Sequence, residues 1–204
     1  MITMGLLLIA AALFLVGYNL YDDARASQSV EQIIAQMDEP QLAETEERGD
    51  AAPEGEGRLA EIPDYILNPE MDMPEEIIDG HGYIGVLEIP AYGLTLPVMS
   101  EWSYPNLKIA PCRYQGSPYT DDLILAAHNY TRHFGNLKCL EAGDRITFTD
   151  VDGNVFSYEV ALVETLMPTA IDAMESGDWD LTLFTCTIGG AYRVTVRCER
   201  LEKE

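Results

Sequence analysis

Basic residues are scarce in this 204-residue sequence, which has 12 lysines and arginines against 35 acidic residues. The formal charge of −23 is the opposite of what a phosphate backbone attracts, so the composition argues against a nucleic-acid partner. The acidic excess is uneven, because residues 22–80 contain 18 acidic residues and only three basic ones. The charge therefore belongs mostly to one segment and says little about the folded part of the chain.

Signatures of metal and phosphate binding are also missing. The four cysteines include no C-x-x-C pair, and the three histidines lack a matching partner at zinc-ligand spacing, so we expect no metal site. No glycine-rich phosphate-binding loop occurs, and we expect no cofactor. One disulfide, with Cys112–Cys139 as an example, is compatible with an extracellular location, but sequence does not fix a pairing.

Charge is absent from residues 1–21, MITMGLLLIAAALFLVGYNLY. About 20 apolar residues cross a bilayer, and a buried core helix would show a polar face that this segment lacks, so we predict a transmembrane anchor. A cleaved signal peptide is the alternative, because Ala24-Arg25-Ala26 fits a small-x-small cleavage pattern. The missing basic n-region argues against cleavage, and it also leaves the orientation weakly determined.

Residues 22–80 are predicted to form an acidic linker or arm. A short helical pattern places Val30, Ile33, Ile34 and Met37 at spacings of three and four. After Pro40 the composition is too acidic and too poor in large apolar groups to order itself. Residues 63–80 contain three prolines and several apolar residues, so they form either an extended arm against the domain or, as we favour, linker.

Residues 81–204 are predicted to form a single all-β domain. Short alternating or apolar runs, each a candidate strand, are separated by turns, and the runs are 83–89, 94–99, 123–127, 145–150, 154–166, 181–186 and 192–198. Val-Asp-Gly at 151–153 is a hairpin signal, and helical patterns are confined to 134–142 and 169–176. Seven or eight short strands without an internal repeat favour a closed β-barrel or a sandwich.

The three histidines differ in their surroundings. His81 stands before a glycine in the lead-in segment and is interpreted as a loop histidine. His133 has polar residues on both sides and is interpreted as a loop histidine exposed to solvent. His128 closes the apolar run DDLILAAHN, where a strand would reach the surface. A rigid strand end is a suitable support for a general acid or base, although the pattern alone slightly favours a structural histidine.

Cys186 ends the apolar run LTLFTC, and Arg193 begins the next one. A cysteine in this position is either an inert buried thiol or a nucleophile, and a nucleophile needs a nearby cation and access to solvent. The Gly189-Gly190 turn would fold the second strand back along the first and bring Arg193 close. Strand alternation is equally consistent with an outward polar face made of Arg193, Thr195 and Arg197.

These segments together resemble the sortases, the cysteine transpeptidases of Gram-positive cell surfaces. TLFTC matches the TLxTC signature, AAHNYTRHFGNLKCLEAGDRITF is similar to the histidine segment, and YRVTVRCERL is similar to the closing strand with its arginine. IGVLEIPAYGLTLPV resembles the opening strands, and the His–Cys–Arg order is the expected one. The resemblance covers about residues 82–201 and implies a closed sortase-type β-barrel preceded by a transmembrane helix and an acidic linker.

The resemblance implies a role for each matching residue. Cys186 is expected to be the nucleophile, His128 the acid/base and Arg193 the stabiliser of oxyanion or substrate, with Thr185 assisting through its hydroxyl or amide. The implied partners are surface or pilin proteins with a sorting signal, and an amine acceptor such as a lipid-linked peptidoglycan precursor. The implied location is the cell membrane, with one span and an extracellular catalytic domain.

Other protein families and a non-catalytic function fit the same residues less well. The short segment between 166 and 181 argues against the long helix of class B sortases. The S-H-G-C stretch of L,D-transpeptidases is missing, and papain-like enzymes place the cysteine before the histidine. The remaining alternative is a non-catalytic, membrane-tethered β-barrel that binds a ligand at the cell surface.

Overall fold

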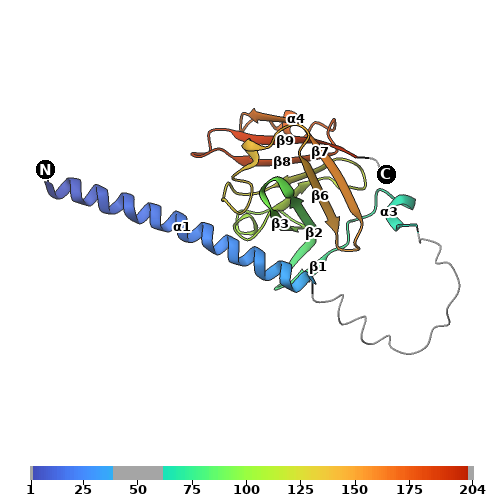
Figure 1. Cartoon of the computed structure of the whole chain (residues 1–204), viewed down its shortest axis with the longest axis horizontal. Coiled ribbons are helices and arrows are strands. Elements are labelled where there is room, and N and C mark those ends of the chain that lie inside the picture. The colour runs from blue at the N-terminus through green and yellow to red at the C-terminus, as the bar shows by residue number, and fades with distance from the viewer. Residues whose placement is uncertain (1, 39–61, 202–204) are drawn as a thin grey trace, which may run out of the picture.

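A computed structural model describes residues 2–38 and 62–201 of the chain. One long helix, α1 (Ile2–Asp38), runs alongside and beyond a β-barrel that contains most of the other described residues (Figure 1). The part of the predicted acidic linker between residues 39 and 61 lies outside the described residues.

Eight strands close into a barrel. The sheet order is β2-β3-β4-β5-β8-β9-β7-β6, and an additional β2–β6 pairing joins its two edges. The bounds are β2 His81–Ile89, β3 Leu94–Met99, β4 Cys112–Gln115, β5 Leu123–Ala126, β6 Arg145–Asp150, β7 Val155–Leu166, β8 Leu181–Cys186 and β9 Arg193–Arg200. The predicted closed β-barrel of seven or eight strands is confirmed, and a ninth strand, β1 (Glu76–Ile78), pairs with β2 outside the closed ring.

Every run predicted as a strand contains one, but two strands were missed. Both β1 and β4 are short, and the β4 sequence CRYQ has no apolar alternation to reveal it. The Val-Asp-Gly hairpin is confirmed between β6 and β7, where Gly153 has φ +82° and its N–H donates to Asp150 O at 3.0 Å. The helices of the barrel region are short: α3 (Asp64–Leu67), α4 (Ile171–Met174) and the 3-10 turns η1 (Pro90–Tyr92), η2 (Asn106–Lys108) and η3 (Leu137–Cys139).

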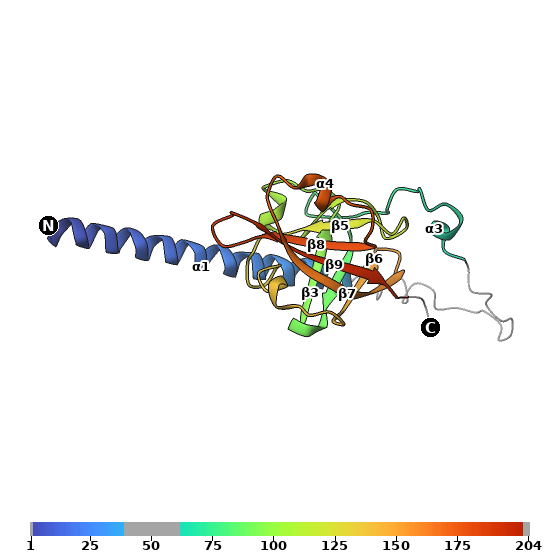
Figure 2. The same cartoon turned by 90° about the horizontal axis from the view of Figure 1, so that it is seen from above.

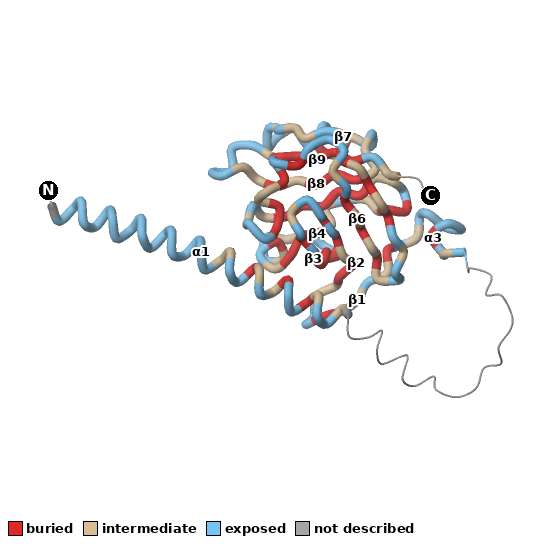
Figure 3. The backbone as a smooth tube through the Cα atoms, viewed as in Figure 1, coloured by how far each residue is buried: buried red, intermediate tan, exposed pale blue. Residues whose placement is uncertain are grey.

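The core fills the inside of the barrel. Alternate residues of each strand point inward, and Figure 3 shows the strands as largely buried while the first half of α1 is exposed. The largest apolar side chains without significant exposure include Leu87, Leu123, Phe134, Phe148, Phe156 and Tyr158. Closure of the sheet leaves no free edge, so the strand ends, where side chains can meet, are held on a rigid frame.

Helix α1 has two halves with different surroundings. Its first half is exposed, and an 18-residue window with mean hydropathy 2.0 makes the helix long and apolar enough to cross a membrane. Its second half packs on the barrel through Ala26, Val30 and Ile33, which recur at helical spacing and are at most 6% exposed. The helix continues without a break through residues 24–26, where the signal-peptide alternative places its cleavage site. It also extends beyond the short helical pattern predicted from residue 30 to residue 37.

Residues 63–80 lie against the barrel, as in the arm alternative, whereas the sequence pattern favours a linker for this segment. Tyr65 of α3 stacks on Tyr119, with 4.8 Å between ring centroids and 12° between planes, and Met73 is buried. The apolar groups of this segment therefore cover core residues instead of staying in solvent. Figure 2 shows α3 at the end of the barrel away from the start of α1.

Closure of the barrel depends on Gly85, where β2 pairs with β3 and β6 at once. Gly85 has φ +150°, and a Cβ there would collide with the backbone of Thr149 on β6. We expect Gly85→Ala to lower the free energy of unfolding by more than about 2 kcal/mol in urea denaturation. Gly177→Ala is the control, since nothing lies within 4 Å of a Cβ there. Equal effects of the two substitutions would contradict this account.

Candidate active site

The parallel pairing of β5 with β8 brings the ends of these two strands together. Ala126 is opposite Phe184 in the register, and the N–H of Ala127 donates to Phe184 O at 3.2 Å. Continuing that register by two residues places His128 beside Cys186. On the other side of β8, Cys186 is the antiparallel partner of Arg193 at the start of β9. Three adjacent strand ends thus carry the three residues in one row.

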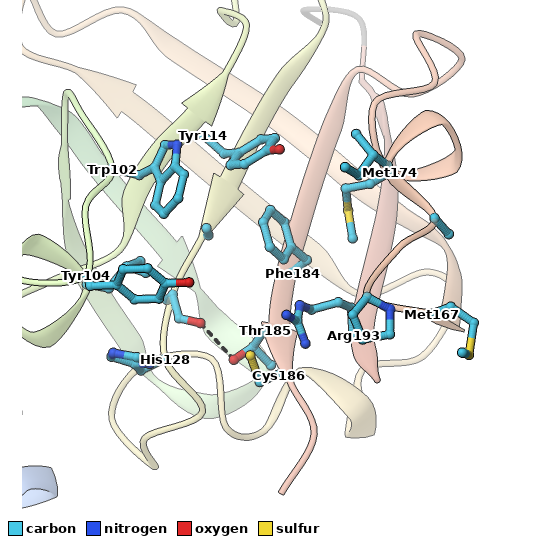
Figure 4. A pocket seen from close by; sticks show the side chains of 16 residues that line it. Trp102, Tyr104, Tyr114, His128, Met167, Met174, Phe184, Thr185, Cys186 and Arg193 are labelled. Carbon is cyan, nitrogen blue, oxygen red and sulfur yellow. Dashed lines mark hydrogen bonds between the residues drawn. The ribbon is translucent and has the colours of Figure 1, made fainter. Parts of the chain in front are cut away.

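These side chains surround one cavity of about 410 Å³. His128, Thr185, Cys186 and Arg193 all line it, and Figure 4 shows Cys186 between His128 and Arg193. The remaining lining is mostly apolar or aromatic, and none of residues 62–80 takes part, so the arm does not cover this cavity. A half-buried thiol between an imidazole and a guanidinium, at the side of an apolar pocket, is an arrangement suited to acyl transfer.

Thr185 is buried and connects β8 to the histidine segment. Its hydroxyl donates a hydrogen bond of 2.8 Å to the carbonyl of Ala127, the residue before His128. This contact fixes the end of β5 relative to the cysteine strand. The hydroxyl is therefore engaged in a bond to the residue before His128. Of the two contributions expected of Thr185, the one through its hydroxyl would have to compete with this bond.

His128 is half-buried, and its environment favours the neutral ring. Burial is the largest cause that lowers its pKa below the ordinary value of 6.5, and the positive charge of Lys108 lowers it further. The carboxylate of Asp22, at the end of the apolar half of α1, opposes both by raising the pKa. The proton affinity of His128 is thus set in part by a residue 106 positions away in the chain.

Arg193 faces the cavity and also the turn that follows Cys186. Its Nη1 donates to the carbonyl oxygens of Gly190 and Tyr192 at 3.2 and 3.3 Å. The turn itself is closed by the N–H of Gly190 donating to Thr187 O at 2.8 Å. These bonds hold the guanidinium near the strand end while leaving it half-buried at the pocket.

The alternative of an outward polar face made of Arg193, Thr195 and Arg197 is wrong for Thr195 and Arg197. Thr195 is 0% and Arg197 1% exposed, because the segment between β7 and β8 covers this face of β9. Arg197 pairs with Glu164 at 2.9 Å and donates to Met174 O and Thr182 Oγ1, each at 3.0 Å, and to Ala173 O. A buried arginine thus holds α4, and Ile171 and Met174 of α4 line the cavity together with Met167, which precedes the helix.

Sequence reasoning also missed the aromatic side of the cavity. Trp102 is 5.9 Å from Tyr104 and 5.8 Å from Tyr114 between ring centroids, and Tyr114 makes an edge contact of 5.3 Å with Phe184. Trp102 and Tyr104 remain exposed at the pocket mouth. The aromatic residues are scattered among loops and strands, so no spacing in the sequence reveals that they meet.

The interpretations of the other two histidines need correction. His133, expected in solvent, is 0% exposed, because the turn that follows His128 folds inward and packs its ring near Tyr130, at 5.4 Å between centroids. Burial lowers the pKa of His133 to about 4, so the ring is neutral at ordinary pH. His81, expected in a loop, begins β2. Neither residue lines the cavity.

All four cysteines are free thiols, so the Cys112–Cys139 pairing considered above is not present. Cys112 and Cys198 are buried, and burial raises the pKa of each to about 12. Cys139 is exposed and Cys186 half-buried. Within residues 2–38 and 62–201, no group of three or more His, Cys, Asp or Glu residues is arranged to hold a metal ion.

Comparisons with known proteins agree on one family. The sortase domain model matches residues 87–201, which is more than half of the chain. A search of curated proteins finds no match.

Three solved structures illustrate the shared fold. Sortase C1 of Streptococcus agalactiae is 25% identical with a TM-score of 0.56, and the match covers 72% of this chain and 80% of that one. Streptococcus pneumoniae sortase C is 25% identical with a TM-score of 0.54, covering 59% and 70%. Sortase C1 of the GBS pilus island 1 is 23% identical with a TM-score of 0.52, covering 60% of this chain and 66% of that one.

Exposure of the thiols predicts which of them react. We expect a maleimide to modify Cys139 and Cys186 in the folded protein within minutes, and Cys112 and Cys198 only after unfolding, because reaction requires an accessible thiolate. Peptide mapping by mass spectrometry would identify the sites. Rapid modification of Cys112 or Cys198 without denaturant would contradict the burial described here.

The hydrogen bond of Thr185 predicts a difference between two substitutions. Thr185→Val removes the donor and leaves the buried Ala127 carbonyl unpaired, a loss of about 1–3 kcal/mol. Thr185→Ser retains the hydroxyl. Urea unfolding should separate the two variants by that amount, and modification of Cys186 by the maleimide should persist in both. A serine variant as unstable as the valine variant would refute the role given to this bond.

Proposed function

The chain belongs to the sortase family, and from this premise we propose that it is a cysteine transpeptidase in which Cys186 is the nucleophile, His128 the acid/base and Arg193 the oxyanion stabiliser. Family membership supports a cysteine transpeptidase in general. The observation that carries the residue assignment is the row formed by these side chains at the ends of β5, β8 and β9 around one cavity.

The first half-reaction forms a thioacyl-enzyme. The Cys186 thiolate attacks the carbonyl carbon of a sorting-signal peptide, and the carbonyl electrons move onto oxygen to give a tetrahedral oxyanion. Arg193, held by two turn carbonyls beside the cysteine, supplies positive charge where that oxyanion develops. Collapse of the intermediate breaks the carbon–nitrogen bond, and the His128 imidazolium, formed when the ring takes the proton of the Cys186 thiol, donates that proton to the departing amine.

The second half-reaction transfers the acyl group. An amine of the acceptor attacks the thioester carbon, the now neutral His128 takes up a proton from it, and the carbon–sulfur bond breaks to return the thiolate. The product is a new amide, so one peptide bond is exchanged for another without a cofactor. The neutral ring left by the first half-reaction is the form that burial favours, because burial lowers the pKa of His128, and this form can accept the proton.

The shape and lining of the cavity support a peptide as acyl donor. Its volume of about 410 Å³ accommodates a few side chains, and Trp102, Tyr114 and Phe184 offer apolar surface for them. We propose that the donor is a surface or pilin protein with a sorting signal. The acceptor would be a pilin amine or the amine of a lipid-linked peptidoglycan precursor.

The apolar half of α1 supports a location at the membrane. Together with the family, a helix long enough to span a bilayer supports anchoring through the N-terminus. We propose a single-pass anchor with the barrel on the extracellular side, where cell-wall acceptors are found.

Replacement of the nucleophile tests the proposal. The full chain in detergent, incubated with a panel of sorting-signal peptides and a small amine, should cleave one peptide, accumulate a thioester on Cys186 and release the transpeptidation product. Cys186→Ala should abolish cleavage and the thioester adduct in intact mass spectrometry, because Cys186 supplies the one thiol among the residues that line the cavity.

Cys139→Ala is the matched control, because it removes another accessible thiol outside the cavity and should leave turnover unchanged. Peptide binding that persists in Cys186→Ala, with no cleavage by the unmodified chain under any condition, would instead support a non-catalytic binding module. Arg193→Ala should retain the thiol and lower the acylation rate by about 100-fold, as removal of an oxyanion donor does.

A further inference from the structure

Helix α1 contacts the loop that carries His128. This His128 loop, residues 128–136, follows β5 and is folded back on itself, with the N–H of Phe134 donating to His128 O at 3.2 Å and that of Gly135 donating to Tyr130 O at 2.9 Å. At its outer corner the N–H of Thr131 donates to Asp23 Oδ1 at 2.7 Å. Asp23 is the only carboxylate of α1 bonded to backbone among the described hydrogen bonds.

A second contact joins the same two elements farther along the helix. Arg132 forms an ion pair with Glu31 at 3.3 Å, but both side chains are more than half exposed, so this pair contributes little. Between the two contacts the helix is seated on the barrel by Ala26, 0% exposed, and Val30, 5% exposed. The helix turn at Asp22 and Asp23 is therefore held near the loop by the bond to Thr131 and by the packing of Ala26 and Val30 on the barrel.

We propose that Asp22 and Asp23, where the apolar half of α1 ends, are positioning residues of the active site: Asp23 fixes the His128 loop through Thr131, and Asp22, the residue before it, adds negative charge on the same helix turn. The proposal rests on the proposed function only in taking His128 as the group that donates and accepts the proton. Neither carboxylate lines the cavity, so neither is assigned contact with substrate.

The charge of Asp22 acts in one direction against several opposing influences. It raises the pKa of His128, which burial and Lys108 lower, and both aspartates raise the pKa of the neighbouring Tyr130. Further titratable or charged groups lie near the His128 loop or line the cavity with its ring: Arg25 of α1, Lys108 of η2, Cys186 of β8, Arg193 of β9, and Tyr130 and His133 of the loop itself. Asp22 is the carboxylate that favours the protonated ring.

The arrangement connects the anchor to the chemistry. Asp22 directly follows the uncharged stretch of residues 1–21, so the contact with the His128 loop lies within one helical turn, about 5 Å, of that stretch. A barrel separated from α1 would lose both the hydrogen bond to Thr131 and the negative charge near His128. The active site is therefore complete only when the second half of α1 is docked, close to the membrane surface.

Point variants of the full chain in detergent micelles test the electrostatic part. Asp22→Asn should shift the pKa of His128 downward, measured by NMR titration of the histidine ring, whose signal is assigned by its loss in His128→Gln. Glu31→Gln removes the same charge from the same helix and should leave the His128 pKa unchanged. An unchanged pKa in Asp22→Asn, or an equal shift in Glu31→Gln, would overturn the role of Asp22.

The positioning part is tested at Asp23. Asp23→Ala should lower kcat/KM for peptide transfer by about fivefold to tenfold, as loss of one ordinary hydrogen bond predicts, and speed hydrogen exchange at the Thr131 amide. Asp23→Asn keeps an oxygen acceptor and should restore most of the activity and the protection. Equal losses in both variants, or wild-type exchange at Thr131 in Asp23→Ala, would overturn the role of Asp23.

The readouts separate this proposal from the proposed function. The His128 titration and the Thr131 exchange do not require turnover, so they test the helix contact even if the unmodified chain cleaves no peptide. Conversely, thioester formation on Cys186 with unchanged kcat/KM in Asp22→Asn and Asp23→Ala would leave the transpeptidase assignment in place and refute the positioning roles.

Discussion

The parallel pairing of β5 with β8 is the constraint on which the candidate site depends. Parallel neighbours end at the same edge of a sheet, so His128 and Cys186, 58 residues apart in the chain, leave the barrel side by side. The antiparallel partner β9 begins where β8 ends and adds Arg193 to the same row. The bond from Thr185 to the Ala127 carbonyl fixes the first pair of strands just before His128 and Cys186.

Elements outside the row give it a binding surface and an electrostatic setting. Arg197 is buried under the segment between β7 and β8 and holds the carbonyls of Ala173 and Met174, so that apolar side chains of this segment face the pocket. A buried arginine of this kind is costly unless its donors are satisfied, and here Glu164 and three backbone or hydroxyl oxygens satisfy them. On the opposite side of the cavity, α1 brings the carboxylate of Asp23 to the His128 loop, which makes the second half of α1 part of the same structural unit.

Local patterns were sufficient for much of this. The strands β2, β3 and β5–β9 each contain a clear run of alternating or apolar residues. The Val-Asp-Gly turn between β6 and β7 depends only on the backbone conformation of its own residues, such as the positive φ of Gly153. The strand ends at His128 and Cys186 were visible for the same reason. The short β4, whose four residues pair with β3 at a single position and with β5, has no such signal, because its strand conformation is imposed by its neighbours.

The sequence by itself determined the all-β class, the residue types at the strand ends and the apolar length of the first helix, because each depends on neighbouring residues in the chain. The tertiary structure decided which strand ends meet, that His133 and Arg197 are buried, and that Asp23 reaches Thr131 across 108 positions. Those outcomes depend on strand order and on which surfaces become covered. No local spacing contains that information, since burial is a property of the whole packed chain.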